Sequence, residues 1–224
     1  MKMIFAYCLK WSKNCLRITV PRYFHTAKSP VLLMNTNMGK SNLNDYIIWL
    51  DMEMSGLDVN TSQILEIACL ITNKDLKVVS KDLNVIIHQP DEILNNMNDW
   101  CLATHQKTGL INESRLSKTT VENAEQIVLK YLKTYIEEEA TCPLAGSSVY
   151  MDRMFLYKYM PLVNNYLHYR IIDTSTIKEL IKRWNTNVPT FKKNHVHRAL
   201  PDVKESIREL QYYKDHIFDL CIRS

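Results

Sequence analysis

Tyr46-Ile47-Ile48-Trp49-Leu50-Asp51-Met52-Glu53 is an apolar run that ends in two acidic residues one position apart. Successive side chains of a β-strand point to opposite faces, so a strand over this run brings Asp51 and Glu53 to the same face. Two converging carboxylates repel each other unless a cation lies between them. The run therefore predicts a strand whose end carries half of a metal site.

An acidic pair at a strand end is, by itself, more often a solvated turn than a metal site. Two later segments supply further ligands. Asp152 begins a predicted helix after a strand, and His197 lies five residues before Asp202 at the start of another helix. Four carboxylates and a histidine are the side chains of two-metal phosphoryl transfer, in which cations activate water and the histidine takes its proton.

The rest of the chain alternates between strand and helix patterns. Strands are predicted at 63–72, 82–88, 142–147 and 169–173, and helices at 91–100, 119–138, 152–159, 175–184 and 202–213. Thr119 and Glu122 form a capping-box pattern at a helix start. Three adjacent strands indicate an antiparallel beginning, and the later alternation indicates an α/β fold with a mixed five-stranded sheet flanked by helices.

The charge of the chain is unevenly distributed. The whole chain has a formal net charge of +4, with 28 Lys and Arg against 24 Asp and Glu. Residues 1–44 hold seven of the basic residues and no acidic one, so residues 45–224 have a net charge of −3. An acidic body is poorly suited to clamping long polyanions, so a nucleic-acid substrate is expected to be held by local contacts.

The six cysteines show neither a C-x-x-C pair nor the spacing of metal ligands. This pattern indicates reduced thiols and an intracellular compartment, since secreted domains of this size more often pair their cysteines.

Residues 1–42 are expected to form a leading segment before a single domain at 43–224. Wound as a helix, the basic residues of its first half fall on one arc and the apolar residues opposite, as in a mitochondrial presequence. A secretory signal and a disordered tail are the alternatives, and no run is long enough to span a membrane. The expected location is the mitochondrial matrix or intermembrane space, whereas a start at Met34 or Met38 would give a cytosolic or nuclear form.

Longer motifs resemble the oligoribonucleases, small 3′-to-5′ exonucleases of a group named for an acidic tetrad and a histidine. The resemblance covers about residues 45–218, and its motifs are Trp49 to Leu57, Ile86 to Pro90, Ser148-Val149, Asp152-Arg153, Phe155-Leu156, Tyr159-Met160-Pro161 and His168 to Leu180. It implies an RNase H-like fold, a homodimer, and hydrolysis of di- to pentanucleotides of single-stranded RNA to 5′-mononucleotides, with short DNA as a further substrate. It also implies two divalent ions per site, Mg²⁺ or Mn²⁺, bound by Asp51, Glu53, Asp152 and Asp202, with His197 as general base.

The resemblance further implies how a short substrate is held. Leu57 and Trp100 would stack on the bases, and Tyr169 would add an aromatic surface from the partner subunit. A cap on the terminal 5′-phosphate would block longer chains, and its side chains would be Ser148, Ser175, Arg170 and His105, with His168 in the same binding set. The alternatives are a place in the core for Leu57 and Trp100 and an ordinary strand entry for residues 168–170.

Three assignments in and near the site depend on position. His197 is preferred to His195 because its five-residue offset from Asp202 matches the family. Asp173 is expected to cap the helix that follows it instead of binding metal. Glu66, midway along a strand, is expected to bond locally.

Ser147 and Pro201 depart from the family pattern, which has Asn and Asp at these positions. Neither departure removes a catalytic group, and Pro201 suits the first turn of a helix. Two other functions stay open at this point, namely a DNA proofreading or repair exonuclease and a non-catalytic RNA-binding dimer.

Overall fold

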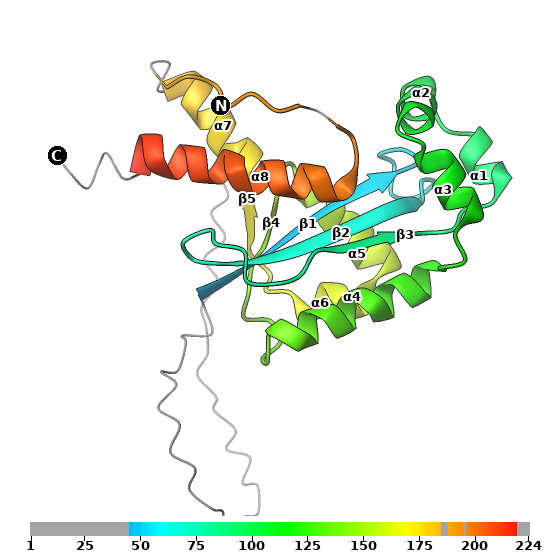
Figure 1. Cartoon of the computed structure of the whole chain (residues 1–224), viewed down its shortest axis with the longest axis horizontal. Coiled ribbons are helices and arrows are strands. Elements are labelled where there is room, and N and C mark those ends of the chain that lie inside the picture. The colour runs from blue at the N-terminus through cyan, green and yellow to red at the C-terminus, as the bar shows by residue number, and fades with distance from the viewer. Residues whose placement is uncertain (1–44, 185–187, 195, 219–224) are drawn as a thin grey trace, which may run out of the picture. The chain divides into compact units, whose positions relative to one another are not determined.

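A five-stranded sheet organises residues 45–184, 188–194 and 196–218, which are the residues that the computed structural model describes (Figure 1). Its strands are β1 (Tyr46–Met54), β2 (Ile64–Asn73), β3 (Leu83–Ile86), β4 (Leu144–Gly146) and β5 (Ile171–Asp173). They lie in the order β3-β2-β1-β4-β5. β1, β2 and β3 are antiparallel neighbours, whereas β4 is parallel to both β1 and β5. The predicted mixed sheet is therefore confirmed.

Helices cover both faces of this sheet. They are α1 (Asp91–Asn95), α2 (Asp99–Lys107), α3 (Leu110–Leu116), α4 (Val121–Tyr135), α5 (Tyr150–Tyr159), α6 (Pro161–Tyr166), α7 (Thr174–Trp184) and α8 (Ala199–Tyr213), which continues as a π-helical turn over Lys214–Phe218. Figure 1 shows α8 on one side of the sheet and α4 and α6 on the other.

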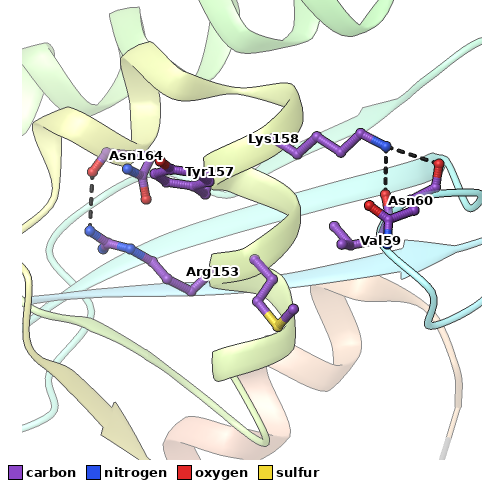
Figure 2. Close-up of a pocket in the computed structure, with 7 residues that line it drawn as sticks. Val59, Asn60, Arg153, Tyr157, Lys158 and Asn164 are labelled. Carbon is purple, nitrogen blue, oxygen red and sulfur yellow. Dashed lines mark hydrogen bonds between the residues drawn. The ribbon is translucent and has the colours of Figure 1, made fainter.

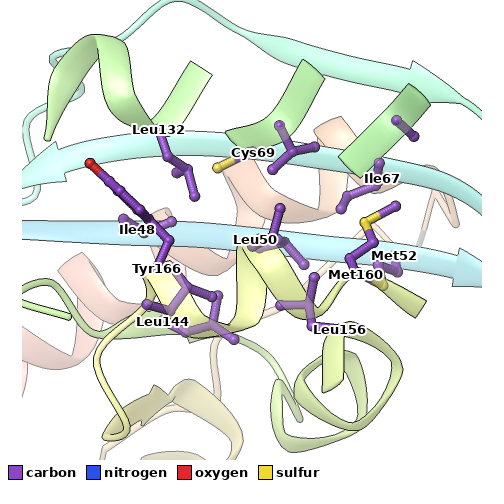
Figure 3. Close-up of a cluster of buried hydrophobic side chains, with 14 of the residues drawn as sticks. Ile48, Leu50, Met52, Ile67, Cys69, Leu132, Leu144, Leu156, Met160 and Tyr166 are labelled. Atoms are coloured by element: carbon purple, nitrogen blue, oxygen red, sulfur yellow. The ribbon is translucent and has the colours of Figure 1, made fainter. Parts of the chain in front are cut away.

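The pleat of β1 divides its side chains between two cores. The even-numbered residues from Ile48 to Met52 lie in the larger core with side chains of α4, α5 and α6 (Figure 3). Trp49 points to the opposite face and packs with Ala68 and the apolar side of α8. Asp51 and Glu53 alternate in phase with Trp49, so both carboxylates lie on the α8 side of the sheet.

β2 is buried along nine of its ten residues. It lies between β1 and β3, and helices cover both of its faces, which explains its nearly continuous apolar sequence. Glu66 is the carboxylate within this strand, and its side chain is buried. A buried charge is costly without partners, so Glu66 needs hydrogen bonds that the rest of the fold provides.

The helix predicted at 91–100 is in fact two helices, α1 and α2. Asn98 separates them, because its side chain caps α2 by accepting a 2.9 Å hydrogen bond from the backbone nitrogen of Cys101. α3 and α6 were not predicted, since each is only seven or six residues long. Such short helices carry too few residues to show a helical period.

Two helix starts also differ from the prediction. The cap of α4 is Thr120, which accepts from the backbone nitrogen of Asn123, and not Thr119. α8 begins at Ala199, three residues before the predicted start at Asp202. Asp202 therefore lies inside the first turn of α8.

The expected leading segment and its boundary lie outside the described residues. Within the described part of the chain, none of the helices combines the length and the apolar character needed to cross a bilayer.

Candidate active site

Three acidic side chains meet where the end of β1 faces the first turn of α8. Asp51, Glu53 and Asp202 each offer a carboxylate oxygen, and these oxygens all lie within 4.8 Å of one another. Asp51 and Glu53 come from alternate positions of β1, and Asp202 comes from α8. Carboxylates this close repel one another unless a cation or a proton lies between them.

Asp152 joins this group from the first turn of α5, where its side chain is buried. Its Oδ1 accepts a 2.9 Å hydrogen bond from the backbone nitrogen of Met52, the residue between Asp51 and Glu53. After burial, the charge of Asp152 is the largest cause that raises the pKa of Asp51. All four carboxylates of the predicted tetrad therefore converge at the end of β1.

Gly146 allows α5 to start this close to β1. A Cβ at this position would lie 2.8 Å from the carbonyl oxygen of Leu50 and 2.9 Å from the side chain of Val149. Because backbone cannot move aside as a side-chain end can, β4 must end in glycine for Asp152 to reach β1.

Burial raises the pKa of every carboxyl group in the cluster. It raises the pKa of Glu53 to about 8, with repulsion from Asp202 as the next cause. It raises the pKa of Asp152 to about 8 as well. The pKa values of Asp51 and Asp202 also rise, with burial as the first cause. Divalent ions that prefer carboxylate oxygen fit this donor set, since they supply the positive charge that the cluster needs.

His197 precedes α8 and has a backbone φ of 56°, in the left-handed region that few residues other than glycine adopt. Burial raises the pKa of Asp202, and the charge of His197 opposes that rise, so the two groups are electrostatic neighbours. The ring of His197 also meets the ring of Trp100 edge-on, with 5.3 Å between their centroids and 88° between their planes. His195, the alternative base, lies outside the described residues.

Leu57 and Trp100 lie on the surface. Their exposed fractions are 68% and 59%, so the alternative that places them in the core is wrong. Leu57 follows the end of β1, and Trp100 contacts His197. Both apolar side chains are therefore available to stack on a base beside the carboxylate cluster.

Ser148 and Ser175 lie together, with 3.1 Å between their hydroxyl oxygens. Asp173 holds both, because its Oδ1 accepts from the backbone nitrogen of Ser148 at 2.8 Å and of Ser175 at 2.9 Å. Its contact with Ser175 is the expected cap at the start of α7. The hydroxyl of Ser147 is also 3.1 Å from that of Ser175, so the departure at Ser147 keeps a polar contact in this group.

Residues 168–170 present a largely exposed aromatic and basic surface. Tyr169 is 73% exposed, and the guanidinium carbon of Arg170 lies 5.2 Å from the centroid of its ring. His168 lies beside Tyr169, and its Nδ1 accepts from the backbone nitrogen of Arg170. Among residues 45–184, no hydrogen bond joins Arg170 to Ser148 or Ser175. The structure therefore brings the predicted serines together, and Arg170 lies beside Tyr169.

His105 is buried against the end of β1. Its side chain is 1% exposed, its Nε2 is 3.0 Å from the carbonyl oxygen of Met54, and its Nδ1 is 3.9 Å from Oε2 of Glu53. Burial lowers the pKa of this ring, which favours its neutral form. In the structure His105 thus contacts the end of β1 next to Glu53, and its predicted contact with a terminal phosphate stays a prediction.

Lys193 and Arg198 bring positive charge to the cluster, and neither was predicted as a site residue. Burial raises the pKa of Asp202 and of Glu53, while Lys193 opposes the rise at Asp202 and Arg198 opposes it at Glu53. Both residues belong to the segment around His197, which was interpreted only through its histidine. The basic residues of that segment could have indicated that it brings positive charge to the carboxylates.

Comparison with known proteins gives matches over most of the chain. A family model described as Exonuclease matches residues 48–210. A probable oligoribonuclease from Drosophila melanogaster is 48% identical over 178 residues, which cover 79% of this chain and 84% of that protein. An oligoribonuclease from Francisella tularensis subsp. holarctica is 43% identical over 176 residues, which cover 79% of this chain and 98% of that protein.

Solved structures of exonuclease I share the fold. The enzyme from Methylocaldum szegediense has a TM-score of 0.61 at 14% identity, and the zinc-bound complex of E. coli exonuclease I with single-stranded DNA has a TM-score of 0.62 at 14% identity. Each match covers 79% of this chain but only 42% of the longer exonuclease I chain. At this identity the likeness confirms the RNase H-like fold alone.

We expect the free energy of unfolding of the metal-free protein to fall as the pH rises from about 5 to 8. Carboxyl groups of the unfolded chain lose their protons near pH 4, whereas Glu53 and Asp152 keep theirs up to about pH 8 in the folded state. The folded state binds more protons across this window, so each rise in pH favours unfolding. Thermal unfolding in EDTA, repeated across the pH range, measures this slope.

A saturating divalent ion should reverse that loss, because it binds the deprotonated carboxylates of the folded state only. Glu53→Gln should flatten the metal-free slope, whereas Glu137→Gln, at an exposed glutamate after α4, should leave it unchanged. Metal-free stability that rises with pH between 5 and 8 would contradict a buried, proton-sharing cluster.

Proposed function

Because this chain belongs to the oligoribonuclease family of exonucleases, we propose that it shortens very short RNA from the 3′ end and releases 5′-mononucleotides. The observation that carries this proposal is the convergence of four carboxylates at the end of β1, with His197 as their neighbour. Hydrolysis of a phosphodiester needs a base for the attacking water and positive charge around the phosphate. The cluster and His197 provide a place for each.

Asp51, Glu53, Asp152 and Asp202 would hold two divalent ions, Mg²⁺ or Mn²⁺. A site of carboxylates alone suits such hard cations. When bound, the ions lower the pKa of a bound water and offset the charge that develops on the leaving oxygen. The 2.9 Å hydrogen bond from Met52 fixes the Asp152 carboxylate against β1 before any ion arrives.

His197 would accept the proton of the attacking water through an unprotonated ring nitrogen. Its position between Asp202 and Trp100 supports this role. A nucleobase stacked on Trp100 would lie next to His197, the proposed general base. Binding of the terminal nucleotide and deprotonation of water would then occur at one place.

The preference for very short substrates would come from a few local contacts. Leu57 and Trp100 would hold the bases without reading their sequence, and the paired hydroxyls of Ser148 and Ser175 would face the terminal 5′-phosphate. The net charge of −3 on residues 45–224 supports this proposal, since long RNA is usually held by a basic groove. The same contacts would accept short DNA.

Asp152→Asn should nearly abolish release of mononucleotides from short RNA in the presence of Mg²⁺. The substitution keeps the shape of the side chain but removes the charge that would bind metal, so the loss should exceed the ~100-fold that is typical of changes around a metal ligand. The measurement uses 5′-labelled RNA in a length series from dinucleotide to decanucleotide, with a parallel DNA series.

Asp91→Asn is the matched control, because Asp91 is an exposed carboxylate in α1 that pairs with Arg115. Its activity should equal that of the wild type. Full activity of Asp152→Asn would refute the proposed chemistry, and decanucleotides cleaved as fast as dinucleotides would refute the preference for short substrates.

We also propose that the protein acts as a homodimer in which Tyr169 of the partner subunit completes each site. The outer face of α5 supports this proposal, because it exposes the apolar side chains of Tyr150, Met154 and Tyr157. Large exposed apolar patches mark interaction surfaces. A second copy of the chain is the proposed occupant of this face. The exposed Tyr169 of one subunit would then contribute to the active site of the other.

A cavity of about 560 Å³ lies on the same face of α5 (Figure 2). Its polar edge is preorganised: Lys158 donates to the carbonyl oxygens of Val59 and Asn60, and Arg153 donates to the carbonyl oxygen of Asn164. Its apolar side chains are left to pack on a partner. This combination of an apolar centre and a satisfied polar rim is usual for protein interfaces.

Combined substitution of Met154→Glu and Tyr157→Glu should convert the dimer to a monomer of 26.3 kDa, because two charges would be buried at the interface. Light scattering after size exclusion measures the mass. Leu116→Glu, at an exposed apolar residue of α3, is the control and should stay dimeric. A dimeric Met154→Glu/Tyr157→Glu variant would exclude this face, and a monomeric wild type would exclude the dimer.

We further propose that residues 1–42 direct the protein to the mitochondrial matrix or intermembrane space. The basis is the sequence of this segment, which has basic residues and no acidic one. A fluorescent protein fused behind residues 1–42 should enter mitochondria, and replacement of Lys2, Lys10, Lys13 and Arg17 by Gln should prevent this. Diffuse fluorescence of the unmodified fusion would contradict the proposal, whereas translation from Met34 or Met38 should give a cytosolic or nuclear form.

A further inference from the structure

Glu66 has a full set of hydrogen-bond donors although it lies within the buried strand β2. Its side chain is 1% exposed. Arg198 donates to it twice, from Nε to Oε2 and from Nη2 to Oε1, each at 3.0 Å. The backbone nitrogen of Ala199 adds a 3.1 Å bond to Oε2, and Nδ2 of Asn84 adds a 2.9 Å bond to Oε1. The Glu66–Arg198 pair is therefore bidentate, which fixes direction as well as distance.

The other side of the Arg198 guanidinium contacts α3. Nη2 donates to Oε2 of Glu113 at 2.6 Å, and Nη1 donates to Oε1 of Glu113 at 3.2 Å and to the carbonyl oxygen of Thr108 at 3.3 Å. One side chain thus joins β2, the α2–α3 connection and the start of α8. Such a planar fork is a rigid connector, and lysine has no equivalent of it.

These contacts act on the residue next to His197. Arg198 is the N-cap of α8, and Ala199 is its first residue, so both residues that follow His197 are tied to Glu66. His197 itself has a φ of 56°, a conformation that persists only where the surroundings hold it. Glu66 thus fixes both C-terminal neighbours of His197, and Glu113 and Thr108 hold the Arg198 side chain as well.

The Glu66 contacts also relate His197 to the metal site. Glu66 is the antiparallel partner of Glu53 in the β1–β2 register, so the two carboxylates lie side by side on the same face of the sheet. The sheet therefore contributes to the position of His197 relative to the cluster, together with the preceding segment, in which Asn194 donates to Glu205 of α8. Glu66 and Arg198 can position His197 in this way without touching the substrate.

We propose that Glu66 and Arg198 are positioning residues that hold His197 in place for proton transfer from water. This inference rests on the proposed function, since it assigns the pair to the general base of that reaction. A displacement of about 1 Å of a catalytic group lowers rates by ~100-fold.

Arg198→Ala should lower kcat for an RNA dinucleotide by about 100-fold and change KM and the affinity for Mn²⁺ little. Arg198→Lys should lose part of this rate because it keeps the charge without the fork, and added guanidinium ion should restore part of the activity of Arg198→Ala. Arg115→Ala, which breaks the exposed ion pair with Asp91, is the matched control and should behave as the wild type.

The pH dependence separates positioning from general damage. A base catalyst gives a rate that levels off once the base is deprotonated, whereas a site without one gains rate with rising hydroxide concentration. The deficit of Arg198→Ala should therefore shrink as the pH rises, as should that of His197→Ala. A deficit that is the same at every pH would overturn the proposal.

A second variant covers the case in which Arg198→Ala does not fold because Glu66 is left buried without a counter-charge. The double change Glu66→Gln and Arg198→Gln removes both charges, so it should recover thermal stability while kcat stays low. Recovery of both stability and kcat would mean that the pair serves folding only.

The state of the His197 ring gives a readout that does not depend on activity. In the NMR spectrum of protein with labelled histidine, the ring of Trp100 should shift the signal of the His197 ring. That signal is assigned by its absence in His197→Ala. Arg198→Ala should abolish that shift, and Arg115→Ala should keep it. A wild type that releases no mononucleotide would defeat the proposed function alone, whereas an unchanged His197 signal in Arg198→Ala would defeat the positioning role alone.

Discussion

Repulsion among four carboxylates, two of them buried and two half-buried, is the constraint around which this fold is built. The carboxyl groups come from β1, α5 and α8, and burial raises the pKa of each. A set of like charges in low dielectric separates unless the backbone holds it. The sheet holds two of them by the pleat of β1, the Met52 amide holds Asp152, and packing of α8 on Trp49 holds Asp202. Packing in the two cores therefore keeps the four carboxylates together and also stabilises the fold.

The features that could be predicted from the sequence are those with local patterns. The strand at 46–53, the buried strand at 63–72 and the helix before Trp184 all appear close to their predicted ranges. The tetrad could be predicted because each carboxylate lies at a recognisable point, a strand end or a helix start. The homologous motifs then supplied His197 and the exposed Leu57 and Trp100.

The features that could not be predicted depend on long-range contacts. Glu66 and Arg198 are 132 residues apart, so the sequence around Glu66 does not indicate which residue binds it. His105 could not be distinguished from a surface residue by sequence, because its burial results from how α2 packs on the end of β1. α3 and α6 are too short to show a helical period in the sequence. In each case tertiary packing determines the structure, and local helix or strand propensity does not reveal it.

The division of the site across the chain has a consequence for synthesis. α8 closes the smaller core over Trp49 and Ala68 and also carries Asp202, so the fourth ligand is absent until residue 202 has been synthesised. A growing or truncated polypeptide lacks both that core and that ligand. The site is therefore complete only when α8 has packed on the sheet.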